Sequence, residues 1–409
     1  MAASGRNADL VELGDLDELV RHVDRLVDGR EWPGLVDLHD RCRRALARGK
    51  QLWPIASLVE YRLALEAPGE WAAQMLTDEH GRFTLGPLPE VAASTHQWSE
   101  LAPHLVPGPL AVVFAHERVV RGEDLAGVDL PGPPVLDLPL TLAPWEPSYP
   151  LATYRSFAAD FPTPQSSNGA PAAHVVPGPG GGTLRVATND APHDRARDHT
   201  PHADADAAHA EPRNGPTDKA DARTPQDEPR NGPPDNANAD ARTPHAEPRN
   251  GPPDNADART PQDDPAARAL AGLARTWITE SNGRVDAVAV AGDAVAAIHR
   301  IAPVEVRVTP IEPADALADM AWTAASGGAH GRRRGMAAGR FEAWWTAVAL
   351  CGFDEDEPVE PDQLGQAVAE LRWYRWDAME PATGWELRLA VEDPDDGLAW
   401  AVAATDASL

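Results

Sequence analysis

The chain has 409 residues and a formal net charge of −28, with 36 Lys and Arg against 64 Asp and Glu. An acidic protein is repelled by phosphate backbones and anionic lipid surfaces, so we expect neither a nucleic-acid partner nor membrane association. Two cysteines, Cys42 and Cys351, exclude a disulfide framework and a multi-cysteine metal site. No apolar run reaches the roughly 18 residues of a membrane span, and the N-terminus lacks the apolar core of a signal peptide. We therefore expect a cytoplasmic protein with no cofactor and no metal.

Residues 1–130 are predicted to form a helical region. Apolar residues recur at helical spacing from Leu16 to Val27, and Gly29 follows where a helix C-cap is expected. Pro33 opens a second helix in its first turn. The expected helices cover 16–27, 33–45, 52–65, 90–102 and 109–121, with a shorter one that carries Trp71 and Met75. Successive helical hairpins predict an all-helical bundle or a short α-solenoid, a class that displays protein-binding faces.

Residues 131–160 are expected to be extended. Leucine recurs at every second position, at Leu136, Leu138, Leu140 and Leu142, and this period of two predicts a strand. Pro139 restricts that strand to a sheet edge. A lone strand is not stable, so we expect it to dock on a sheet formed by the C-terminal part.

Residues 161–267 are predicted to be a disordered linker rich in Pro, Ala and Asp. The segment repeats Glu-Pro-Arg-Asn-Gly-Pro at 211–216, 228–233 and 247–252, in degenerate units of 17–19 residues. These units carry no apolar positions that could stack into a core, so they do not predict a solenoid. Its His and Asp residues have no fixed arrangement that would hold a metal ion.

Residues 268–409 are predicted to form an α+β domain with a mostly antiparallel sheet. Asn282-Gly283 is typical of a tight turn and predicts a hairpin between 276–281 and 284–290. A second hairpin is expected around 394–397. Helices are expected at 293–300, 313–325 and 362–371, with a Trp-rich helix ending near Ala349.

The segment from Ser326 to Phe341 carries the candidate site. Four glycines recur at every fourth position, 327, 331, 335 and 339, and four arginines fall within nine residues. As a loop before a helix, the segment would offer backbone N–H groups and guanidinium groups to an anion. As a continuous helix, it would instead pack on its glycine face, with its arginines paired to carboxylates of the chain. The candidate anion-binding residues are His330, Arg332, Arg333, Arg334 and Arg340.

The same region carries a family resemblance. Four segments resemble the C-terminal portion of an actinobacterial family of unknown function. They are Gly327-Gly-Ala-His-Gly331, Ala338-Gly-Arg-Phe341, Ala343-Trp-Trp345 and the stretch 276–284. The resemblance implies no catalytic residue.

Two functional hypotheses follow. The first is a non-enzymatic protein-interaction or regulatory module whose helical region binds a protein partner. The alternative is a binding protein or enzyme that holds a phosphate- or carboxylate-bearing small molecule at 326–341. A loop facing a pocket would favour the second hypothesis, and a continuous helix would favour the first.

Overall fold

The computed structural model describes residues 10–77, 81, 84–161, 264–302, 305–354, 358–378 and 384–407, and the backbone of a short antiparallel pair, β3 (Val176–Pro177) and β4 (Thr183–Leu184). The predicted linker therefore lies almost entirely outside the described residues. Its last residues are helical, because α9 (Pro265–Gly272) follows the N-cap residue Asp264, whose carboxylate accepts a hydrogen bond from the Ala267 amide at 2.9 Å. The described residues on either side of 162–263 belong to one compact unit.

The predicted helical region is confirmed. Its long helices are α2 (Leu16–Asp28), α3 (Trp32–Ala47) and α4 (Trp53–Glu66). Most apolar residues expected on their inner faces are buried, whereas Leu16 is 40% exposed. The shorter elements are α5 (Gly69–Ala72), η1 (Ala73–Met75), α6 (Leu88–Ala93), α7 (Trp98–Leu101), η2 (Ala102–His104) and α8 (Pro109–Val119).

The single helix expected at 90–102 is wrong, since α6 and α7 are separate helices. The Ser94 hydroxyl donates to the Val91 carbonyl at 2.6 Å, and the Thr95 hydroxyl donates to the Leu65 carbonyl of α4 at 2.8 Å. Such side-chain hydrogen bonds to the backbone compete with helix continuation.

The edge strand expected at 136–142 is also wrong, because this segment forms no strand and joins no sheet. Its carbonyls have other partners: Pro139 and Thr141 accept hydrogen bonds from the Arg340 guanidinium, and Leu140 accepts one from the Leu125 amide. Leu138 and Leu142 pack against the C-terminal core. A short hairpin follows, formed by β1 (Thr153–Arg155) and β2 (Ala158–Asp160).

The C-terminal sheet has the antiparallel topology that the sequence predicts. Five strands lie in the order β5-β9-β8-β7-β6, and every neighbouring pair is antiparallel. The strands are β5 (Arg284–Ala291), β6 (Arg307–Ile311), β7 (Arg372–Asp377), β8 (Gly384–Asp393) and β9 (Leu398–Ala407). The hairpin expected around 394–397 is the β8–β9 turn.

The hairpin expected before β5 is wrong, because its first arm is the helix α10 (Arg275–Glu280). Trp277 is fully buried, its ring packs edge-on against Trp322, and its indole N–H donates to the Ser326 hydroxyl at 2.9 Å. Burial of this one large ring outweighs the local turn preference of Asn282-Gly283. Strand β5 pairs with β9 instead.

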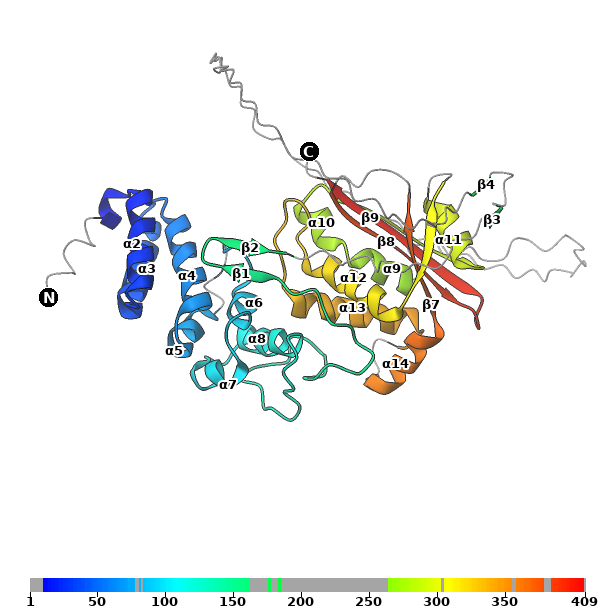
Figure 1. Cartoon of the computed structure of the whole chain (residues 1–409), viewed down its shortest axis with the longest axis horizontal. Helices are drawn as coiled ribbons and strands as arrows, with labels where there is room; N and C mark the ends of the chain where they lie inside the picture. The colour runs from blue at the N-terminus through cyan, green and yellow to red at the C-terminus, as the bar shows by residue number, and fades with distance from the viewer. Residues whose placement is uncertain are drawn as a thin grey trace, which may run out of the picture. The chain divides into compact units, whose positions relative to one another are not determined.

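Helices cover both faces of the sheet (Figure 1). The larger core lies between one sheet face and a group of helices, α9, α10, α12 (Pro313–Ala325), α13 (Met336–Leu350) and α14 (Pro361–Glu370). Helix α11 (Ala294–Ile301) packs on the other face, where Ala390 and Ala401 are fully buried. The larger core also includes Ala143 and Tyr149, so the segment before residue 162 is part of it.

Helices α12 and α13 approach each other closely at Gly339, where an added Cβ would overlap the Ala321 carbonyl oxygen. We expect Gly339→Ala to lower the free energy of unfolding by about 1–3 kcal/mol, because the backbones must separate. Gly272→Ala at the end of α9 is the control, since its Cβ would meet no atom closer than 3.6 Å. Equal stability of the two variants in urea unfolding would contradict close helix packing.

Candidate functional site

The glycine- and arginine-rich segment is a loop followed by a helix. Helix α12 ends at Ala325, residues 326–335 are irregular, and α13 begins at Met336. The N-cap residue, Gly335, has φ +95°, a conformation that favours glycine. The continuous helix with a glycine face is therefore wrong, and the loop interpretation is confirmed for the conformation of this segment.

Hydrogen bonds from other parts of the chain hold the loop. The Ala329 amide donates to the Asp406 carboxylate at 2.6 Å, the Arg332 amide to Glu280 at 3.0 Å, and the Arg334 amide to the Ala325 carbonyl at 2.7 Å. Three of its backbone donors are thus used within the protein. The exposed residue His330 also donates its amide, to the Ser281 hydroxyl at 3.1 Å.

Arg333 forms a buried bidentate ion pair with Glu90 of α6. Its Nε lies 2.8 Å from Glu90 Oε2, and its Nη2 lies 2.7 Å from Glu90 Oε1. The Tyr154 hydroxyl donates to the same carboxylate at 2.7 Å. Burial favours the neutral acid, but the charge and hydrogen bonds of Arg333 outweigh it, so the pKa of Glu90 is lowered.

A second buried carboxylate, Glu117 of α8, occupies the N-terminus of α13. Its Oε1 accepts from the Ala337 amide at 2.9 Å, and its Oε2 accepts from Arg121 Nη1 at 2.6 Å. A negative charge is favourable at this end of the helix dipole. Burial and the nearby charge of Glu90 nevertheless raise the pKa of Glu117 to about 7. The N-terminus of α13, where an external anion was expected, already holds a carboxylate of the chain.

Arg340 also forms a buried ion pair. It and Glu146 are both fully buried, with Nε 2.6 Å from Oε2 and Nη2 2.8 Å from Oε1. Its remaining bonds go to the carbonyls of Pro139 and Thr141, both at 2.9 Å. Arg340 therefore anchors the irregular segment before β1.

The five predicted site residues do not converge on one point. Arg332 and Arg333 line a pocket, Arg340 is in the core, and the more exposed Arg334 pairs with Glu342 at 2.9 Å. The carboxylates that the arginines contact, Glu90, Glu146 and Glu342, were not among the predicted site residues. A single acidic residue within an apolar helical stretch, as at Glu90 and Glu117, is the sequence pattern that could have indicated these buried carboxylates.

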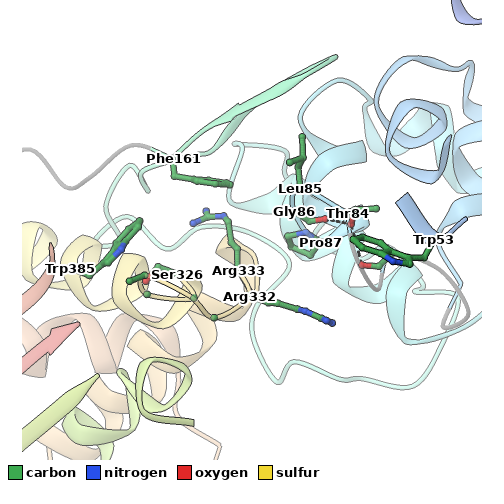
Figure 2. Close-up of a pocket in the computed structure, with 15 residues that line it drawn as sticks. Trp53, Thr84, Leu85, Gly86, Pro87, Phe161, Ser326, Arg332, Arg333 and Trp385 are labelled. Atoms are coloured by element: carbon green, nitrogen blue, oxygen red, sulfur yellow. Dashed lines mark hydrogen bonds between the residues drawn. The ribbon is translucent and has the colours of Figure 1, made fainter. Parts of the chain in front are cut away.

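The pocket has a volume of about 610 Å³ and opens between the helical region and the loop (Figure 2). Its large apolar side chains are contributed by Trp53, Leu85, Phe161 and Trp385. The remaining described lining residues are Gly81, Thr84, Gly86, Pro87, Ser326, Gly327, Gly328, Ala329, Gly331, Arg332 and Arg333. The predicted loop thus forms one wall of a real cavity.

The described lining residues offer few polar groups. They include no carboxylate, imidazole or thiol. The Thr84 hydroxyl lies 2.6 Å from the Gly86 carbonyl, and the Ser326 hydroxyl lies 3.0 Å from the Thr323 carbonyl, so both have backbone partners. The guanidinium groups are therefore the main polar features of this wall.

Neither cysteine belongs to the pocket. Burial raises the pKa of Cys42 to about 11 and that of Cys351 to about 12, so both are poor nucleophiles near neutral pH. Within the described ranges, no three His, Cys, Asp or Glu side chains are grouped to hold a metal ion, and the His and Asp residues of the linker lie outside those ranges. No helix in the described part of the chain is long and apolar enough to cross a membrane.

Together, the fold and the pocket define an acidic protein with an N-terminal helical region and a C-terminal α+β part. The chain belongs to a family of unknown function, DUF6183, whose pattern matches residues 17–215 and 210–408. The predicted membership of a family of unknown function is confirmed. The match extends beyond the C-terminal residues on which the prediction was based. No match was found among curated proteins or among solved structures.

The different environments of Arg340 and Arg334 predict losses of stability of different size for the same substitution. Arg340→Met leaves Glu146 buried without its counter-charge, so we expect a loss of about 3–5 kcal/mol in the free energy of unfolding. Arg334→Met removes a partly exposed pair and should cost less than about 1 kcal/mol. Urea unfolding of both variants measures the difference. Similar losses would show that Arg340 is not the core anchor described above.

The raised pKa of Glu117 predicts a pH-dependent contribution to stability. A carboxyl whose pKa is higher in the folded than in the unfolded chain binds more protons when folded, so its contribution falls as pH rises from about 5 to above 7. Relative to Glu117→Gln, the wild type should therefore lose stability across this range. Chemical unfolding at several pH values measures the difference, and a constant or increasing difference would be the contrary result.

Proposed function

We propose that this protein is a binding module that holds a small organic anion in the pocket beside loop 326–333. The observation that carries this proposal is the loop itself, which faces a cavity and contributes Arg332 and Arg333 to its wall. Ligand pockets are commonly about 300–1,000 Å³, mostly apolar, with a few fixed polar groups. The volume and lining of this cavity fall within that description.

The exposed apolar side chains at the pocket support a binding role. Trp53 is 43% exposed and Leu85 is 51% exposed, although both are large hydrophobic residues. Exposed apolar surface next to a cavity is typical of binding sites, because a ligand removes it from water. Covering these side chains would contribute favourable free energy in proportion to the apolar area buried.

The polar groups of the wall favour an anion. Arginine stays charged at all physiological pH values, and its planar N–H groups match carboxylate and phosphate oxygens. Arg333 is held in place by Glu90, so little conformational freedom remains to be lost on binding. The site is therefore organised before its ligand arrives.

The described lining supports binding rather than catalysis. Proton transfer commonly requires a positioned His, Asp, Glu, Lys, Tyr or Cys, and the described wall supplies none. The separate hypothesis that the helical region binds a protein partner stays a prediction.

A binding test can use ligand-observed NMR with a library of small organic acids and matched neutral amides. We expect acids to bind the wild type and to lose binding in Leu85→Trp, which adds bulk to the pocket wall. Leu13→Trp is the control, because Leu13 is 77% exposed and does not line the pocket. Absence of any acid that binds, or equal binding to Leu85→Trp, would contradict the proposal.

A further inference from the structure

We infer that the ligand is a flat aromatic acid whose ring stacks on Trp385 and whose acidic group bonds to Nη1 of Arg333. The inference rests on the proposed binding function and specifies the class of ligand. It follows from which surfaces of these two side chains are already occupied. Both belong to the same pocket, as Figure 2 shows.

Trp385 is held as a stacking platform at the start of β8. Its ring stacks on Trp322 with centroids 5.1 Å apart and planes inclined by 24°. Trp322 is only 3% exposed and in turn packs edge-on against Trp277 at 6.1 Å. Trp322 covers one face of the Trp385 indole and Trp385 also lines the pocket, so we place the ligand ring on the opposite face. A planar ring placed there would continue the stack.

Within the described residues, one nitrogen of Arg333 has no hydrogen-bond partner. Its side chain is 7% exposed, and its Nε and Nη2 both donate to Glu90. The Phe161 ring lies over the guanidinium, 5.1 Å from its central carbon. Nη1 donates to no residue in the described ranges, so it retains two N–H donors on a guanidinium fixed at the wall. A carboxylate or phosphate oxygen is the matching acceptor.

The rest of the described lining disfavours a ligand rich in hydroxyl groups. The hydroxyls of Thr84 and Ser326 have backbone partners, and the opposite side presents Trp53 and Leu85. A sugar placed against these residues would lose its hydrogen bonds to water without replacement. An aromatic body leaves no such group unsatisfied, which favours an aromatic acid over a sugar phosphate.

Isothermal titration calorimetry on the full chain can test each element of the inference. The probes are 2-naphthoate, the neutral 2-naphthamide, the saturated decahydro-2-naphthoate, and adenosine monophosphate. We expect 2-naphthoate to bind about tenfold or more tightly than its neutral and saturated analogues, in line with the strength of aromatic stacking and of charged hydrogen bonds. Binding of adenosine monophosphate as tight as that of 2-naphthoate would contradict the preference for an aromatic acid over a sugar phosphate, whereas much weaker binding would support it.

Variants at Trp385 separate stacking from general packing. Trp385→Leu should abolish the preference for the flat over the saturated acid, and Trp385→Phe should retain much of it. Phe157→Leu is the control, because Phe157 is 66% exposed and lies outside the pocket. If the flat and saturated acids bind the wild type equally, or if Trp385→Leu keeps the preference, the inference is wrong while the binding function stands. If no probe binds, the inference is wrong, and the screen of organic acids decides the proposed function separately.

Discussion

The buried ion pair between Arg333 and Glu90 is the interaction on which the site depends. It joins two residues 243 positions apart, one in the glycine-rich loop and one in α6 of the helical region. Removing both charges from water is costly, and only good geometry with further hydrogen bonds offsets that cost. The bidentate contact and the Tyr154 hydroxyl provide them. This pair fixes the loop against the helices, and the pocket lies between those two parts.

The need of a buried charge for a partner also explains why the arginine-rich segment does not form one anion-binding cluster. The protein is strongly acidic, and its arginines have carboxylate partners nearby in space: Glu90 for Arg333, Glu146 for Arg340. Two of these pairs are buried and bridge distant parts of the sequence, so they act as anchors for the fold. What is left for a ligand is a restricted set of donors beside apolar surface. Under the proposed function, that restriction would make the pocket selective.

Sequence periodicity predicted those elements whose contacts are local or repeat regularly. Helices α2 to α4 and the β8–β9 hairpin have clear apolar spacing and turn residues, and each is present in the structure. Prediction failed where a single distant contact decides the conformation. The segment expected to be the first arm of a hairpin is instead a helix, because Trp277 is buried there. The segment expected to be a strand is irregular, and its carbonyls accept hydrogen bonds from Arg340. The loop was predictable as one of two alternatives, but its carboxylate partners were not.

The most direct test of this account is a double-mutant cycle on Glu90→Gln and Arg333→Gln, measured as free energies of unfolding in urea. Each single variant leaves a buried polar group without its partner, whereas the double variant removes both charges. We predict that the double variant loses less than the sum of the two single losses, with a coupling energy of about 2 kcal/mol or more. Losses that add to within about 0.5 kcal/mol would show that the two side chains act independently and would contradict the central role of this ion pair.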